Sequence, residues 1–117
     1  MKKISVAAAA ALMQRKNFSR SNTEVKVDKV GNAHLYLFGN RIAVCTASND
    51  LFVTTANWWT RTTFDRLGAL PLVSIRKNRN RLTISGAEWD GDWILIAAIP
   101  PILITKKQNP PYYDYGY

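Results

Sequence analysis

The chain has 117 residues, which is enough for one domain with one hydrophobic core and too few for two. Hydrophobic residues make up 47% and aromatic residues 11% of the sequence, a composition that excludes a disordered chain and allows a buried core. Sixteen Lys and Arg against eight Asp and Glu leave a formal charge of +8, which favours a polyanionic partner: nucleic acid first, then an acidic membrane or protein.

The N-terminal segment, residues 1–13, imitates a signal peptide, because two lysines precede an apolar run that contains an Ala8-x-Ala10 pattern. Alanine, however, is only weakly hydrophobic and is the best helix former. The run also passes directly into Gln14 and two cations, Arg15 and Lys16, which suit a helix C-terminus. We therefore predict a retained amphipathic helix from about Ile4 to Asn17, with a cleaved signal peptide as the alternative.

Period-two alternation follows a polar link, F-S-R-S-N-T, and predicts a series of strands. The alternating apolar residues are Val25, Val27, Leu35, Leu37, Ile42, Val44, Leu51 and Val53. Three turns are expected between the runs, at Gly31-Asn32, Gly39-Asn40 and Ser48-Asn49-Asp50. The second is a Gly-first pair compatible with a type II′ hairpin. Such short turns favour an antiparallel meander over a parallel sheet.

The clearest helix start lies in the stretch T-T-A-N-W-W-T-R-T-T-F-D-R-L-G-A-L, from Thr54 to Leu70. Thr60 can serve as the N-cap, and Thr62 is the alternative, because Asp65 then falls at N3 near the partial positive charge of the helix start. In either case Pro71 ends the helix, and one face carries Phe64, Leu67 and Leu70. Core burial is favoured for this face and for Trp58 and Trp59, although adjacent side chains before a helix rarely both face the core.

A basic hairpin follows this helix. Val73 and Ile75 alternate into R-K-N-R-N-R, and Leu82 and Ile84 alternate out of it. The candidate nucleic-acid contacts at its tip are Arg76, Lys77, Asn78, Arg79 and Arg81, with Arg15, Lys16 and Arg20 as further cations that could extend the surface. Arginine can fork onto a phosphate, and asparagine suits phosphate or base-edge hydrogen bonds. A solvated charge run without a function is the alternative.

The C-terminal part predicts one more hairpin and one more strand. Gly86 ends a strand, and E-W-D-G-D-W from Glu88 to Trp93 predicts a tight Asp-Gly hairpin turn. The apolar run Ile94–Ile104 predicts a last buried strand, which Pro100-Pro101 forces into an extended or edge conformation. It is too short to span a bilayer, so we expect no membrane partner. Residues 105–117 form an extended Pro/Tyr-rich tail outside a single α+β domain at 1–104.

The sequence offers little material for catalysis or metal binding. One cysteine, Cys45, excludes an internal disulfide framework, and with the single histidine, His34, it cannot form a Cys/His zinc site. No P-loop, G-x-S-x-G, H-E-x-x-H or G-x-G-x-x-G pattern occurs. Glu88, Asp90 and Asp92 could hold a hard cation, but solvated turn residues are the favoured interpretation. We expect no cofactor, no metal and no enzymatic activity.

Four blocks, taken together, carry a resemblance: N-T-E-V-x-V near Asn22, L-x-L-F-G-N-R-I-A from Leu35, N-W-W-T-R-T-T-F-D-R-L-G-A-L from Asn57 and S-G-A-E-W-D-G-D-W from Ser85. In this order they resemble small uncharacterised proteins of tailed bacteriophages with G-N-x-I-A, W-x-x-x-T-T-x-x-R-L-x-A-L and G-x-E-W-x-G blocks. The resemblance spans Asn22 to Ile94 and leaves the N-terminal helix and the tail outside it. It implies a phage origin and the host cytoplasm as the setting, and it transfers no catalytic residue.

The predicted fold is α+β, with an N-terminal helix, an antiparallel meander of about six strands and one short central helix packed on it. The predicted function is non-enzymatic binding of DNA or RNA by a phage accessory protein through the basic hairpin. The alternative is a protein–protein module: an inhibitor of a host or defence factor, or a minor virion component. A homo-oligomer stays open.

Overall fold

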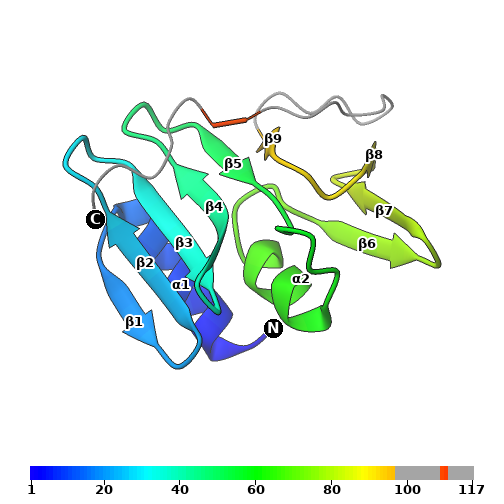
Figure 1. Ribbon diagram of the computed structural model, residues 1–117, viewed down its shortest axis with the longest axis horizontal. Coiled ribbons are helices and arrows are strands. Elements are labelled where there is room, and N and C mark those ends of the chain that lie inside the picture. Colours follow the sequence, from blue (N-terminus) through cyan, green and yellow to red (C-terminus); the bar gives the residue numbers. More distant parts are fainter. Residues whose placement is uncertain (97–108, 111–117) are drawn as a thin grey trace.

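The computed structural model describes residues 1–96 and 109–110 (Figure 1). The elements in chain order are α1 (Lys3–Gln14), β1 (Phe18–Arg20), β2 (Thr23–Val27), β3 (Ala33–Leu37), β4 (Asn40–Cys45), β5 (Leu51–Val53), α2 (Arg61–Gly68), β6 (Ile75–Asn78), β7 (Arg81–Ile84), β8 (Ala87–Trp89) and β9 (Ile94–Leu95). The predicted continuation of the last strand to Ile104, and the tail at 105–117 apart from Asn109 and Pro110, lie outside the described residues.

The main sheet has six strands in the order β1-β2-β3-β4-β5-β9, and each neighbouring pair is antiparallel. The predicted α+β class and the meander are confirmed. Val25, Leu35 and Ile42 are among the buried core residues, as the alternation predicted. The prediction of a polar link at F-S-R-S-N-T was wrong in one respect. Its residues 18–20 form β1, an edge strand that pairs with β2. Phe18 is its single large apolar residue, too weak a signal for the periodicity to detect.

Helix α1 lies across one face of the main sheet (Figure 1). Its buried residues, Ser5, Ala8, Ala9 and Leu12, have helical spacing, and the small alanine side chains let the helix lie close to the strands. The helix ends at Gln14, three residues earlier than predicted. Arg15 adopts the left-handed conformation, and the amides of Arg15 and Lys16 bond the carbonyls of Leu12 and Ala11, which is a Schellman motif.

Helix α2 begins where the sequence predicted, with Thr60 as the N-cap. The Thr60 hydroxyl accepts a hydrogen bond from the Thr63 amide at 3.2 Å, so Thr62 is not the cap. Leu67 and Leu70 are buried and Phe64 is half-buried, which confirms the predicted apolar face. The helix ends at Gly68, so Leu70 packs from the turn that follows rather than from the helix itself.

A second, three-stranded sheet has the order β6-β7-β8 and projects beyond α2 at the right of Figure 1. The predicted Asp-Gly hairpin was wrong, because β8 pairs with β7 whereas β9 crosses to the main sheet and pairs with β5. Gly91 sits in this crossover at a φ of +87°, and its carbonyl accepts hydrogen bonds from the Thr55 amide and from the hydroxyls of Thr54 and Thr55. A Cβ at residue 91 would lie 2.7 Å from the Trp59 indole nitrogen, so this close approach requires glycine.

The turn between β3 and β4 also differs from the prediction. The two loop residues are Phe38 and Gly39, not Gly39 and Asn40, because Leu37 pairs directly with Asn40. Both loop residues have positive φ angles, +50° and +78°, as in a type I′ turn rather than type II′. A bulky residue is uncommon in this position, which is why the sequence pattern pointed to the neighbouring pair.

Candidate nucleic-acid interface

The predicted basic hairpin is formed by β6 and β7, joined by the two-residue loop Arg79-Asn80. Arg79 has a φ of +56° at the loop. Leu82 and Ile84 are buried and hold the β7 strand to the body of the protein, and the Ser85 amide donates to the Ser74 carbonyl at the hairpin base. The apolar base and the basic tip are therefore separated along the same two strands.

Strand pairing divides the tip residues between the two faces of the hairpin. Directly opposite residues of an antiparallel pair share a face. Arg76 pairs with Thr83 and Asn78 with Arg81, so Arg76, Asn78 and Arg81 lie on one face. Lys77 pairs with the buried Leu82 and lies on the other face. The hairpin thus presents two guanidinium groups and an amide together, with Arg79 at the loop beside them.

All five predicted tip residues are exposed. Arg81 forms an ion pair with Glu88 of β8 at 3.5 Å, and both side chains are largely in water, at 81% and 49% exposed, so the pair contributes little stability. Within the described residues, no side-chain hydrogen bond or ion pair holds Arg76, Lys77 or Arg79. These cations are therefore not committed to the fold.

The other predicted cations do not join this surface. The Arg15 guanidinium donates to the Thr46 carbonyl at 2.7 Å and to the Asn49 side chain, and so fastens the end of α1 to the turn between β4 and β5. Lys16 and Arg20 are exposed, and Arg20 lies 5.4 Å over the Phe18 ring. Arg20 belongs to β1, at the opposite side of Figure 1 from the β6–β7 hairpin.

Arg66 forms a buried polar cluster that the sequence did not reveal. It is 4% exposed and donates to the hydroxyls of Thr23 and Ser5 at 2.9 and 2.8 Å and to the Asn22 side chain at 3.3 Å. The Asp65 carboxylate lies 3.6 Å from the Arg66 guanidinium and also accepts from Ser5. This cluster joins α1, α2 and the start of β2. Its members are far apart in sequence, so local patterns could not find it.

The single histidine also has buried partners. His34 Nε2 lies 2.9 Å from an Asp28 carboxylate oxygen, and an Arg41 nitrogen lies 3.2 Å from His34 Nδ1. Arginine can only donate hydrogen bonds, so His34 Nδ1 accepts one from Arg41. The N–H group of His34 is then at Nε2 and donates a hydrogen bond to Asp28. Burial alone would raise the pKa of Asp28, but hydrogen bonds from His34, Asn32 and the Val30 amide lower it to about 2. His34 is fully buried, and its hydrogen bonds join β3 to β4 and to the turn that follows β2.

Two further groups of titratable side chains among residues 1–96 have local surroundings that the structure defines. Cys45 is buried, and burial raises the pKa of its thiol. Asp90 and Asp92 accept hydrogen bonds from nearby backbone amides in their turn, the local role expected of aspartate. Among the described residues, no group of three or more His, Cys, Asp or Glu could hold a metal ion.

A family model described as Kyanoviridae Gp96 protein matches residues 1–95. The chain belongs to this family. The resemblance predicted from the sequence covered too few residues. It ran from Asn22 to Ile94, whereas the Gp96 match also includes α1 and ends at Leu95. The chain is therefore a small phage protein whose family relationship covers both sheets and both helices. No curated protein and no solved structure matches it.

Among the described residues of this Gp96 family member, no helix is long and apolar enough to cross a membrane. The family description names no activity.

Proposed function

We propose that this phage protein binds nucleic acid without catalysis, through the phosphate backbone and the face of the β6–β7 hairpin that carries Arg76, Asn78 and Arg81. The observation that supports it is the β6–β7 hairpin of the three-stranded second sheet, whose guanidinium groups are exposed and whose base is anchored by buried Leu82 and Ile84. Guanidinium groups bond phosphate oxygens in pairs, and the net charge of +8 draws a polyanion to the surface.

Contacts to phosphates would make binding nearly independent of base sequence. Asn78 and Thr83 add uncharged hydrogen-bonding groups to this face, and Asn78, nearest the loop, would support the same backbone contacts. The site requires no cofactor, and the host cytoplasm is where such a protein would meet DNA or RNA.

Fluorescence anisotropy with a short labelled duplex and a labelled single strand tests the proposal. On duplex DNA each phosphate contact contributes a slope of about −0.9 in log K against log salt, so Arg76, Arg79 and Arg81 together contribute about −2.7. Replacing all three by Ser should flatten the slope by that amount. Lys77→Ser is the matched control, because Lys77 lies on the other face; it should change the slope by less than one contact.

Two results would contradict the proposal. Undetectable or salt-insensitive binding by the unaltered protein would remove nucleic acid as the partner and leave an acidic protein surface as the target of the hairpin. Unchanged binding by the triple Ser variant would keep nucleic acid but move its site to other cations, with Lys16 and Arg20 as the next to replace.

A further inference from the structure

A hollow of about 460 Å³ adjoins the basic hairpin, and its lining comes from β7, from β8 with the turn after it, and from the segment before α2. Leu82 and Trp89 of this lining are buried, Trp59 is half-buried, and the exposed members are Asn80, Arg81, Glu88 and Asp90. Arg81 therefore belongs both to this hollow and to the face proposed to bind phosphates. A phosphate bound by Arg81 would place its own nucleotide at the edge of the hollow, whose volume is ordinary for a ligand site.

Two tryptophans give this hollow an aromatic lining that the fold holds in place. Trp89 is 5% exposed, and its indole N–H donates to the Asp92 carbonyl at 2.7 Å. Trp59 packs against the core and lies so close to Gly91 that a Cβ there would come within 2.7 Å of its indole nitrogen. The crossover from β8 to β9 thus fixes both rings without a ligand, and a preformed site costs less to occupy.

The exposed side chains of the hollow combine a cation with hydrogen-bond acceptors. Arg81 and Glu88 form the 3.5 Å ion pair described above. Asp90 Oδ1 accepts from the Asp92 amide at 2.9 Å, and Asp90 Oδ2 has no partner among the described residues. Ionised carboxylates only accept hydrogen bonds and repel phosphates. These two acceptors therefore suit the amino and N–H groups of a base rather than the backbone of a nucleic acid.

We propose that this hollow binds one unpaired nucleobase of a single strand whose phosphates lie on the hairpin arginines, and that it prefers a base with an exocyclic amino group, such as cytosine. Any base can stack on an aromatic ring, and Glu and Asp accept from the cytosine amino group. In a duplex, stacking and pairing already occupy these faces and edges, so a single strand is favoured. This base site rests on the proposed phosphate contacts and adds to them the type of strand.

The charge of the hollow favours a base over a protein side chain. An apolar side chain would offer no donor to Glu88 or Asp90. A basic side chain would offer one, but a basic segment is repelled by the net charge of +8, and Glu88 already has a cation in Arg81. A base is uncharged, and the phosphate attached to it is attracted to Arg81.

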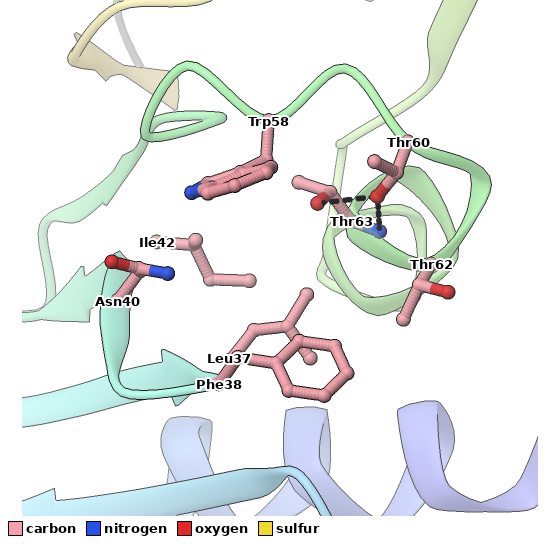
Figure 2. Close-up of a pocket in the computed structure, with 8 residues that line it drawn as sticks. All are labelled: Leu37, Phe38, Asn40, Ile42, Trp58, Thr60, Thr62 and Thr63. Atoms are coloured by element: carbon pink, nitrogen blue, oxygen red, sulfur yellow. Dashed lines mark hydrogen bonds between the residues drawn. The ribbon is translucent and has the colours of Figure 1, made fainter.

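A second hollow supplies the internal control. The Phe38–Trp58 groove, of about 290 Å³, lies between the β3–β4 turn and the start of α2, and its lining contains no charged residue (Figure 2). Trp58 is 54% exposed in this groove and is the sequence neighbour of Trp59. A base that needs only an exposed ring would bind at Trp58, whereas a base attached to a phosphate on Arg81 would bind at Trp59.

Fluorescence anisotropy of the full chain with labelled strands of abasic spacer units tests the base site. One strand carries no base, and two others of equal length and charge carry one central cytosine or one central thymine. The cytosine should raise the affinity about tenfold or more over the base-free strand, and the thymine should raise it less. Glu88→Gln/Asp90→Asn should lose the preference for cytosine over thymine, and its affinity for the base-free strand should be equal or higher, because two negative charges are gone.

Two tryptophan variants locate the base. Trp59→Leu keeps an apolar side chain against the core but removes the ring, so it should lose the affinity that the base adds. Trp58→Leu is the matched control and should retain it. Thermal unfolding shows whether each variant is folded, and the Glu88→Gln/Asp90→Asn variant tests the hollow even if Trp59→Leu does not fold.

The outcomes separate this base site from the phosphate contacts on which it rests. Equal affinities for the base-free and cytosine strands would overturn the base site and leave the phosphate contacts standing. Undetectable binding of every strand would overturn both. Loss of the added affinity in Trp58→Leu, but not in Trp59→Leu, would move the base to the Phe38–Trp58 groove. An Arg/Ser peptide whose binding needs Glu88 and Asp90, with no gain from a base, would replace the base by a basic protein segment.

Discussion

The two groups of arginines in this protein differ in what they do for the fold. Arg15 and Arg66 belong to the half of the molecule built from the main sheet and the helices, and carbonyl, hydroxyl or amide oxygens hold their guanidinium groups. The hairpin arginines of the second sheet are exposed, and only Arg81 has an ion-pair partner, Glu88, among the described residues. Arginine count alone therefore overstates the charge available to a ligand. An arginine is available to a ligand when its guanidinium group has no hydrogen-bond or ion-pair partner within the fold.

The comparison predicts its largest effect at Arg66. Arg66→Ala would leave the buried hydroxyl of Thr23 and the Asn22 side chain without this donor and remove the cation beside Asp65. We expect a loss of about 3–5 kcal/mol in the free energy of unfolding, as for other broken buried pairs. Urea unfolding followed by circular dichroism measures this. A loss within about 0.5 kcal/mol, as at a surface site, would place Arg66 with the uncommitted cations.

The two adjacent tryptophans extend the same comparison to apolar side chains. Trp59 packs against the core and lies beside Gly91, whereas Trp58 is 54% exposed. Trp59→Ala should therefore cost about 3 kcal/mol or more, and Trp58→Ala less than about 0.5 kcal/mol. Equal losses in chemical unfolding would contradict the division between a packed and a displayed tryptophan.

Lowering the pH should change the stability of the fold through its buried acidic groups more than through its exposed ones. The folded pKa of Asp28, about 2, lies below its ordinary value of 3.8. Asp28 therefore stabilises the fold fully above about pH 4, and this contribution is lost as the pH falls toward 2. At about 1.36 kcal/mol per pKa unit, the loss amounts to roughly 2–3 kcal/mol. The free energy of unfolding, measured between pH 5 and 2, should fall less steeply in Asp28→Asn than in the unaltered protein. An equal fall in the two proteins would show that Asp28 does not contribute to the acid sensitivity.

Local signals predicted much of the fold. Alternation located β2 to β5, and the Thr60 cap located the start of α2. The Asp-Gly pair led to a wrong hairpin prediction, because a turn signal does not specify which strands pair. Glycine is required at position 91 because the backbone there approaches Trp59 and Thr55 closely. The basic hairpin was visible because its residues are consecutive.

Other parts of the molecule could not be predicted because they join distant segments. Arg66 meets Ser5 and Thr23 only after α1 and α2 pack together. The Phe38–Trp58 groove likewise brings together a turn and a helix start that are separate in the sequence. Sequence patterns name the hairpin cations, but only strand pairing shows that Lys77 lies on a different face from Arg76 and Arg81.

Replacing the exposed hairpin arginines should change the stability of the fold least and nucleic-acid binding most. The most direct test compares the Arg76/Arg79/Arg81 triple Ser variant with a Lys16/Arg20 double Ser variant, by thermal unfolding and by the salt dependence of duplex DNA binding. The account predicts that both variants unfold within about 0.5 kcal/mol of the unaltered protein, and that only the triple variant loses a slope of about 2.7. An equal loss of slope in the two variants, or a loss confined to the Lys16/Arg20 pair, would contradict it.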